Sequence, residues 1–426
     1  MSDFNTSRRT FLQSSAVAAS ALALAGNVHA GGNDIIRIGL IGCGGRGTGA
    51  AINALTVDKN VRLVAMADAF EDKVQSSLAN LSKSKVADQV TVKPDACFAG
   101  FDAYTKVFDL CDVVLLVTPP HFRPMHLKAA VEAGKHVFAE KPCAVDAGGV
   151  RSVLESCRKA QEKKLSVVSG LCLRYDAGIR ETVKRVHDGE IGKITCLQAN
   201  DYRGAIKTKQ RLPEWSEMTW QMRNWYYYTW LSGDFNVEQH VHFLDVCAWL
   251  MGNKYPVRAI GMGGRQVRTA PEYGQIYDHF SIVYEYADGA RFYSNTRQQE
   301  KCKGDMSAFA SGTKGSVNIA ERDKGLWIKN DREWFWEGET PGGAMYDNEH
   351  AELFKSIREG KPINNGEYMA HSTLLAIMGR MAAYTGQQVT WEQALNSKED
   401  LSPPSYTWDA KMPNWEVAMP GKTRFV

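Results

Sequence analysis

The sequence lacks a marked excess of charge of either sign. Its 426 residues include 51 Lys and Arg against 48 Asp and Glu, a formal net charge of +3. A chain so balanced does not have the strongly basic surface typical of proteins that bind nucleic acid or anionic membranes. With 44% hydrophobic and 23% charged residues, the composition is that of a globular protein, and the length favours two domains.

The sequence also lacks the C-x-x-C cysteine pairs that are typical of zinc sites and redox motifs. Its nine cysteines are odd in number and all follow residue 30. A complete disulfide framework and a structural zinc site are therefore not expected, and most of the cysteines are predicted to be buried thiols.

No apolar run reaches the roughly 20 residues needed to span a membrane. The stretch Ala16–Ala25 is apolar but short; it follows Arg8-Arg9 and precedes the small-x-small pattern Val28-His29-Ala30. This order resembles a twin-arginine export signal. The resemblance implies transport of the folded chain by the twin-arginine machinery, cleavage after Ala30 and a periplasmic or otherwise exported location. A short helix of a cytosolic protein is the alternative.

A glycine-rich turn follows the first apolar strand. Residues Ile35–Ile41 form a near-continuous apolar run, and Gly42-Cys43-Gly44-Gly45-Arg46-Gly47 leads from it into a helix-compatible stretch, Thr48–Leu55. In this G-x-G-x-x-G pattern the first glycine permits the tight turn, the second the approach of a pyrophosphate, and the third the packing of helix on strand. The pattern predicts a dinucleotide-binding domain.

An acidic residue ends the second strand, Val61–Asp68, 21 residues after Gly47. A carboxylate here accepts hydrogen bonds from the adenosine ribose and repels a 2′-phosphate, which favours NAD over NADP. NADP stays possible because a neighbouring arginine can accommodate the phosphate. The alternative is that Asp68 only caps the next helix.

Two more strands end in residues suited to a ligand crevice. Residues Asp112–Thr118 and His136–Lys141 are the strands, and a helix is predicted over His126–Gly134. In a doubly wound sheet the carboxyl ends of the strands face the ligand. The cofactor-binding residues predicted there are Thr118, Pro119, Pro120, His121, Glu140 and Lys141. A last strand, Leu165–Leu173, precedes Arg174-Tyr175.

At Glu140-Lys141-Pro142 the sequence resembles the glucose-fructose oxidoreductase / inositol dehydrogenase family, Gfo/Idh/MocA, as does the turn Thr118-Pro119-Pro120-His121. The resemblance runs from Ile35 to about Thr390. It implies an α/β fold: an N-terminal Rossmann domain with a doubly wound parallel sheet, and a C-terminal α+β domain with a large, mostly antiparallel open sheet. The back of that sheet often joins subunits, so a homo-oligomer is implied.

The residues of the second domain agree with this fold. Short β-like runs occur at 193–202, 257–267, 277–286, 290–296 and 315–319, and helices are predicted over 346–359 and 371–385. The predicted parts are a signal peptide (1–30), a Rossmann domain (31–170), a substrate-binding and oligomerisation domain (171–390) and an extended C-terminal arm (391–426).

A second motif of this sequence, Glu238-x-x-x-His242-x-x-Asp245-x-x-x-Trp249, resembles another hallmark of the family. Many dehydrogenases of the family have aspartate where this sequence has Glu238. The spacing places these residues on one helical face. The catalytic hypothesis is that Lys141 binds the cofactor ribose and the substrate hydroxyl, His242 moves the proton, and Glu238 or Asp245 sets the tautomer of His242.

Two alternatives for this helix are a purely structural histidine–carboxylate pair and a metal site that adds His240. The metal site is not expected, because Glu-x-His-x-His does not place its three ligands on one side of a helix.

Four of the eleven tryptophans crowd into 215–230, beside Tyr226-Tyr227-Tyr228. Flat rings suit the apolar faces of sugars, and the segment 203–232 is predicted to be a carbohydrate-binding lid; packing on a partner subunit is the alternative. The predicted substrate contacts are Arg174, Tyr175, His240, Trp225 and Trp230.

The sequence as a whole predicts an exported NAD(P)-dependent oxidoreductase that acts on the CH–OH groups of a sugar, polyol or glycoside. Because an exported enzyme has no free nicotinamide pool, the cofactor is expected to be tightly bound and recycled in the site. The alternatives are a redox-assisted, NAD-dependent glycoside hydrolase and a non-catalytic sugar-binding protein. Neither nucleic acid nor a resident metal is expected.

Overall fold

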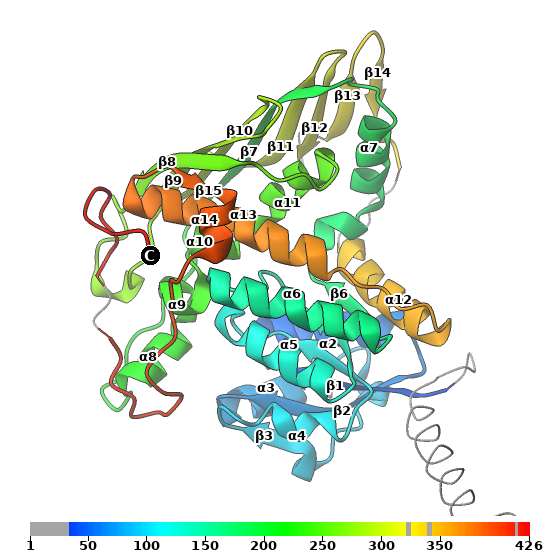
Figure 1. The fold of residues 1–426 in the computed structure, drawn as a ribbon. Helices are drawn as coiled ribbons and strands as arrows, with labels where there is room; N and C mark the ends of the chain where they lie inside the picture. Colours follow the sequence, from blue (N-terminus) through cyan, green and yellow to red (C-terminus); the bar gives the residue numbers. More distant parts are fainter. Residues whose placement is uncertain (1–33, 321–324, 339–342, 414–415) are drawn as a thin grey trace, which may run out of the picture.

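The computed structural model describes residues 34–320, 325–338, 343–413 and 416–426. The predicted export signal and its cleavage site lie outside these residues. Within them the chain forms two domains that pack against each other, with the Rossmann domain below the large sheet in Figure 1.

The first domain contains a six-stranded, all-parallel sheet in the order β3-β2-β1-β4-β5-β6. Its strands are β1 (Ile36–Ile41), β2 (Val61–Asp68), β3 (Cys97–Ala99), β4 (Val113–Leu116), β5 (His136–Ala139) and β6 (Val167–Ser169). Its helices are α2 (Gly45–Val57), α3 (Glu71–Leu81), α4 (Thr105–Phe108), α5 (Arg123–Glu132) and α6 (Ala147–Glu162). The predicted doubly wound Rossmann fold is confirmed; the strand order reverses between β1 and β4, the position where such sheets bind ligands.

The second domain is built on a nine-stranded sheet in the order β14-β13-β12-β11-β7-β10-β9-β8-β15. All its strand pairs are antiparallel except β7 with β10. The strands are β7 (Ile194–Arg203), β8 (Arg258–Gly264), β9 (His279–Glu285), β10 (Arg291–Gln298), β11 (Asp305–Gly312), β12 (Ser316–Ala320), β13 (Leu326–Lys329), β14 (Glu333–Phe335) and β15 (Val389–Thr390). The predicted open sheet is confirmed, and four strands that the sequence patterns did not indicate (β11, β13, β14 and β15) complete it.

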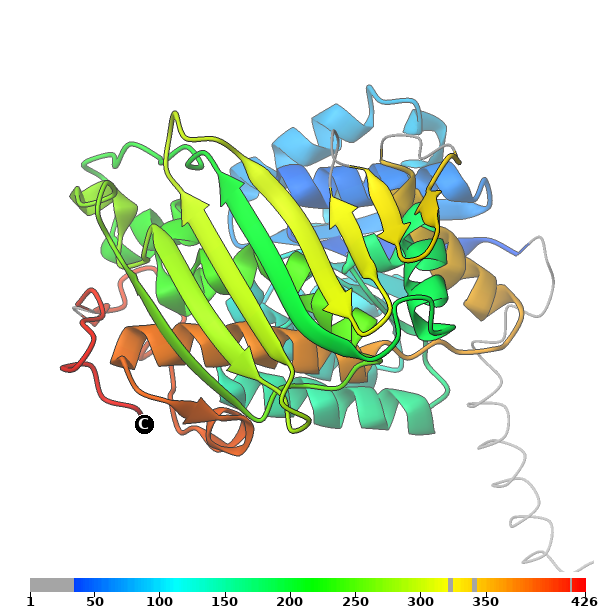
Figure 2. The same cartoon turned by 90° about the horizontal axis from the view of Figure 1, so that it is seen from above.

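The helices of this domain lie on one face of the sheet, and Figure 2 shows the opposite face uncovered. They are α7 (Ala177–His187), α8 (Glu217–Arg223), α9 (Thr229–Ser232), α10 (Phe235–Glu238), α11 (Val241–Leu250), α12 (Ala344–Arg358), α13 (Gly366–Thr385) and α14 (Trp391–Asn396). No helix in the described ranges is long and apolar enough to cross a membrane.

Helix α13 joins the two domains. It packs on β8 and β9 of the large sheet and on α6 of the Rossmann domain, and nearly all its residues are buried, as expected for a helix that is apolar on every side. The predicted return of this helix to the first domain is confirmed.

The C-terminal arm wraps around its own chain (Figure 1). Trp408 packs on Phe101, with ring centroids 4.5 Å apart, and on Phe70 at 4.9 Å. Further along, the Ala418 carbonyl accepts a hydrogen bond from the Tyr277 hydroxyl, and Ser397 Oγ donates to the Val426 carbonyl. The arm therefore uses the cores of both domains instead of one of its own.

Candidate functional site

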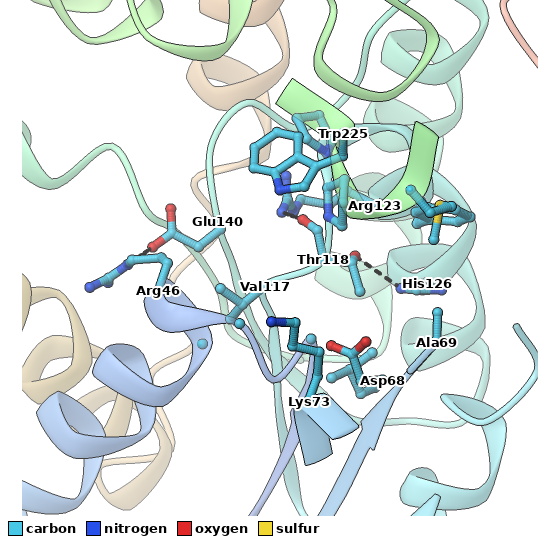
Figure 3. A pocket seen from close by; sticks show the side chains of 18 of the residues that line it. Arg46, Asp68, Ala69, Lys73, Val117, Thr118, Arg123, His126, Glu140 and Trp225 are labelled. Carbon is cyan, nitrogen blue, oxygen red and sulfur yellow. Dashed lines mark hydrogen bonds and ion pairs between the residues drawn. The ribbon is translucent and has the colours of Figure 1, made fainter. Parts of the chain in front are cut away.

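A cavity of about 530 Å³ lies where the strands of the Rossmann sheet end. The first domain lines it with the glycine turn, the ends of β2, β4 and β5, and Lys141. The second domain contributes Glu238, Gln239 and His242, together with Met222 and Arg223. It also contributes Trp225, which Figure 3 shows at the cavity. The volume is in the range of small-molecule sites, and its place at the strand ends is the predicted one.

The glycine turn is shaped by close backbone contacts on one side and open space on the other. A Cβ at Gly47 would lie 1.8 Å from the Gly42 carbonyl oxygen, whereas a Cβ at Gly44 or Gly45 would meet nothing within 4 Å. Helix α2 begins at Gly45, so its first N–H groups lie beside that open space. The turn thus fits the pyrophosphate of a dinucleotide, which such helix ends bind.

Asp68 links the glycine turn to the end of β2. Its Oδ2 accepts a hydrogen bond from the Cys43 N–H at 2.7 Å, and its Oδ1 accepts one from the Phe70 N–H at 3.0 Å. Burial raises the pKa of Asp68, and these two bonds oppose the shift. Because each carboxylate oxygen can accept a second hydrogen bond, Asp68 can hold the turn and still bind ribose hydroxyls.

The turn after β4 is fixed by a buried arginine that the sequence analysis missed. Arg123 is 1% exposed and donates to the carbonyls of Thr118 and Pro142, which follow β4 and β5. Thr118, Pro119 and Pro120 line the cavity as predicted. No motif marks Arg123 in the sequence; its role depends on two loops meeting in space.

Glu140 and Arg46 form an ion pair at the wall of the cavity (Figure 3). Although burial opposes ionisation, Arg46 and Lys141 hold the pKa of Glu140 below its usual value. Arg46 also contacts Glu349 of α12 at 3.3 Å and lies over the Tyr346 ring. The side chain of Arg46 therefore joins the domains, while its place in the turn puts its backbone at the predicted cofactor site.

Three of the four predicted catalytic residues meet in the cavity. Lys141 Nζ donates to the Glu238 carbonyl at 2.6 Å and to Glu238 Oε1 at 2.8 Å, and His242 lines the same wall. Burial, followed by the charge of Lys141, holds the pKa of His242 well below 6.5. Among the described residues, Glu238 Oε2 and His242 Nδ1 have no hydrogen-bond partner. The wall thus presents an ammonium group, a carboxylate oxygen and a neutral imidazole.

The structure corrects the predicted placement of this motif on one helical face. Helix α10 ends at Glu238 and α11 begins at Val241, so a bend separates Glu238 from His242. Asp245 instead accepts two hydrogen bonds from Arg174, at 2.7 and 2.8 Å, and one from Ser372. Neither carboxylate is bonded to His242, because each has its own cationic partner.

The predicted contacts Arg174, Tyr175, His240, Trp230 and His121 all lie behind the cavity wall. Arg174 is held by Asp245, and the Tyr175 hydroxyl donates to Asn365. His240 pairs with Ser294, Trp230 Nε1 donates to Gln221, and His121 pairs with Tyr406. Each of these side chains has a hydrogen-bond partner within the protein, and none of them lines the cavity.

Most aromatic side chains of the segment 203–232 lie in the core and do not form the predicted lid over the cavity. Trp225 lines the cavity, but Trp220, Trp230 and the three adjacent tyrosines are almost fully buried. The crowding of rings therefore reflects packing beneath the cavity. Lys209, Met222 and Arg223 of this segment also reach the cavity, and the sequence analysis did not name Met222.

No group of three His, Cys, Asp or Glu side chains is arranged to hold a metal ion within the described ranges.

Two matches to a known family cover most of the chain. Residues 36–169 match the GFO/IDH/MocA oxidoreductase family with an NAD-binding Rossmann fold, and residues 179–318 match the GFO/IDH/MocA C-terminal domain. The first range coincides with the Rossmann domain, and the second covers the other domain from α7 into β12.

Individual relatives are distant. The chain is 24% identical to an inositol 2-dehydrogenase of Rhizobium meliloti (strain 1021) over 69% of this chain and 78% of the relative. It is 25% identical to a 2,7-anhydro-N-acetylneuraminate hydratase of Escherichia coli (strain K12) over 42% of this chain, and so spans less than half (44%) of that relative's length.

A solved levoglucosan dehydrogenase, in complex with NADH and levoglucosan, has the same fold, with a TM-score of 0.67 at 17% identity over 84% of this chain and 99% of that one. The two family matches establish that the chain belongs to the GFO/IDH/MocA family of oxidoreductases with an NAD-binding Rossmann fold.

Proposed function

We propose that the chain is a NAD-dependent oxidoreductase that moves a hydride between nicotinamide and a secondary hydroxyl or keto group of a sugar or polyol. The observation that carries the proposal is the meeting of Lys141, Glu238 and His242 in the cavity that also contains the glycine turn and Asp68. The inositol 2-dehydrogenase and levoglucosan dehydrogenase among its relatives support a carbohydrate substrate.

Oxidation of a secondary alcohol requires removal of the hydroxyl proton while hydride leaves the carbon. A bound nicotinamide dinucleotide supplies the hydride acceptor. Lys141 has three N–H donors, of which Glu238 takes two, so the third can bind the substrate oxygen. His242 is neutral because of its lowered pKa and can accept the proton. The pairing with Glu238 fixes the position of the Lys141 ammonium group.

NAD is the proposed cofactor because the carboxylate of Asp68 occupies the end of β2, where it would repel a 2′-phosphate. Lys73 lines the same end of the cavity, so the affinities for NAD and NADP need direct comparison. Binding by the wild-type chain, measured by calorimetry, should favour NAD, and Asp68→Ala should reduce that preference.

The proposal includes export by the twin-arginine route with the cofactor already bound, on the evidence of Arg8-Arg9, Ala16–Ala25 and Ala30. A second sugar would then reoxidise the cofactor in place. Analysis of the nucleotide released when protein from a cell-envelope fraction is denatured tests this point. An empty site in exported protein would contradict it.

A second candidate is a reaction with no net redox change, in which the hydride returns to the same molecule after elimination, as in a redox-assisted glycoside hydrolase. The 2,7-anhydro-N-acetylneuraminate hydratase among the relatives supports this second candidate. A sugar-binding protein without turnover is the third candidate, and the Lys141–Glu238 pair beside His242 argues against it.

One experiment separates the three candidates. Purified protein loaded with NAD is incubated with myo-inositol, levoglucosan and a panel of aldoses and glycosides, while the absorbance of reduced nicotinamide is followed. Reduction supports the dehydrogenase. Cleavage or hydration of the sugar without net reduction would support the second candidate, and binding without either would support the third.

We also propose that two copies associate through the uncovered face of the nine-stranded sheet (Figure 2). Ile260, Met262 and Tyr293, on strands β8 and β10, are 54%, 71% and 42% exposed, and exposed apolar patches of this kind mark interaction sites. Light scattering of the wild type should give an oligomer, and Met262→Lys should shift it towards the monomer.

A further inference from the structure

One cavity residue, Gln239, has no role in the chemistry above. It lies in the bend between α10 and α11, directly after Glu238 and three residues before His242, and it lines the cavity. Its Oε1 accepts a hydrogen bond from Arg203 Nη1 at 2.9 Å. Gln239 is therefore held from behind at the point where the predicted catalytic residues meet.

The partner of Gln239 fixes the orientation of its carboxamide. Arginine has five N–H donors and no acceptor, so only the oxygen of the carboxamide can face it. The Nε2 amide must then be on the side turned away from Arg203. A carboxamide bonded to a hydroxyl or to another amide could turn over, but one bonded to arginine cannot do so without losing the bond.

Arg203 is itself fixed. It ends β7, and Asp201, two residues earlier and so on the same face of the strand, accepts bonds from its Nε and Nη2. Asp201 is 1% exposed. Such a bidentate ion pair holds the guanidinium plane in one orientation, and the chain Asp201–Arg203–Gln239 extends from the large sheet to the cavity.

We propose that Gln239 is a specificity-determining residue, which donates a hydrogen bond from Nε2 to a substrate oxygen next to the reacting carbon, and that Arg203 is its positioning residue. Glu238 Oε2, which has no partner among the described residues, offers an acceptor beside this donor. The pair suits a substrate with an oxygen on the carbon adjacent to the reacting carbinol, and it disfavours a simple monohydric alcohol. This inference rests on the proposed function.

Gln239→Glu tests the donor. The substitution conserves size, keeps an oxygen towards Arg203 and adds an ion pair there, so the fold should be kept. It replaces the donor with an acceptor. We expect KM for myo-inositol or levoglucosan to rise about 10- to 100-fold, with kcat and the NAD dissociation constant changed much less. Gln388→Glu, on the exposed surface, is the control for the added charge and should leave KM unchanged.

Arg203→Lys tests the positioning role. Lysine keeps the positive charge but lacks the planar guanidinium that bonds Asp201 and the Gln239 carboxamide together. KM should therefore rise about 3- to 10-fold, a smaller effect than that of Gln239→Glu. In the Arg203→Lys background, Gln239→Glu should have a smaller effect than in the wild type, because the two residues act as one unit.

Four results would overturn the inference. Gln239→Glu with an unchanged KM would show that the donor is not used, and a loss confined to NAD affinity would assign it to the cofactor. Additive effects of the two variants would remove the positioning role. If the wild type reduces bound NAD with neither sugar nor with any member of the panel, the proposed function fails, and this inference fails with it.

Discussion

The two ends of the cavity are built differently. The cofactor end consists mainly of backbone: glycine residues without side chains, the first turn of α2, and an aspartate bonded to two N–H groups. The catalytic end consists of side chains from distant segments, such as Lys141 and Glu238, 97 residues apart. The cofactor end therefore depends on segments of the first domain alone, namely β1, the glycine turn, α2 and the end of β2, whereas the catalytic end exists only when the two domains are docked.

The largest effect should come from breaking the catalytic end alone. Lys141→Met removes the ammonium group that binds Glu238 and that, in the proposed mechanism, binds the substrate oxygen. We expect kcat to fall by about 10³-fold or more while NAD affinity, measured by calorimetry, changes only a few-fold.

A control for this variant is needed because it leaves Glu238 buried without its cation. Lys141→Met combined with Glu238→Gln removes that charge, and it should be equally inactive but at least as stable in a thermal melt. Turnover close to that of the wild type in either protein would eliminate Lys141 from the mechanism.

Two glycine variants should separate folding from binding at the cofactor end. Gly47→Ala places a Cβ 1.8 Å from a backbone oxygen, and we expect a loss of about 2–4 kcal/mol in the free energy of unfolding. The Cβ that Gly44→Ala adds meets no protein atom within 4 Å, so the free energy of unfolding of this variant should equal that of the wild type. Its NAD dissociation constant should rise about 10- to 100-fold, since the methyl group occupies the space for the pyrophosphate.

Chemical denaturation and calorimetry on the same preparations check this pair. Equal stability of the two variants would mean that the turn is not packed as described, and normal NAD affinity in Gly44→Ala would place the pyrophosphate elsewhere.

The pH dependence of kcat/KM tests whether His242, at the catalytic end, is neutral. Burial first, then Lys141, holds the pKa of His242 well below 6.5, so the imidazole stays neutral and able to accept a proton as the pH falls through 6.5. We expect kcat/KM to change less than about threefold between pH 6 and pH 8, with the acid limb at lower pH. A limb at pH 6.5 or above would contradict the buried, neutral state of His242.

The smallest effect should come from the C-terminal arm. Trp408 covers Phe70 and Phe101, two side chains that line the cavity. Trp408→Ala should therefore release bound NAD about 3- to 10-fold faster in a displacement experiment, with kcat little changed. Trp327→Ala, on β13 of the large sheet, is the matched control and should have no effect on release. Equal release rates in both variants would exclude a role of the arm in retaining the cofactor.

The contrast between the two ends also explains what could be predicted. Strands β1, β2, β4 and β5, the glycine turn and Asp68 follow from local periodicity and spacing, and the structure places them as expected. The pairing of Asp245 with Arg174 did not follow, because an even spacing along a helix cannot reveal the bend between α10 and α11.

Side chains whose partners lie in other segments of the chain left even less trace in the sequence. Arg123, Glu349 and Arg203 carry no motif, and their partners lie 19, 303 and 36 residues away. The composition of the aromatic segment was plain from the sequence, but the exposure of its side chains was not: five of its rings fill the core with almost no solvent contact.

The arm has a consequence for the order in which the protein is made. Trp408 follows both domains in the chain, yet it covers Phe70 and Phe101 of the first domain. During synthesis the glycine turn and Asp68 leave the ribosome long before Trp408 does. The glycine turn and Asp68 can therefore take up their places before the segment that covers Phe70 and Phe101 has been made.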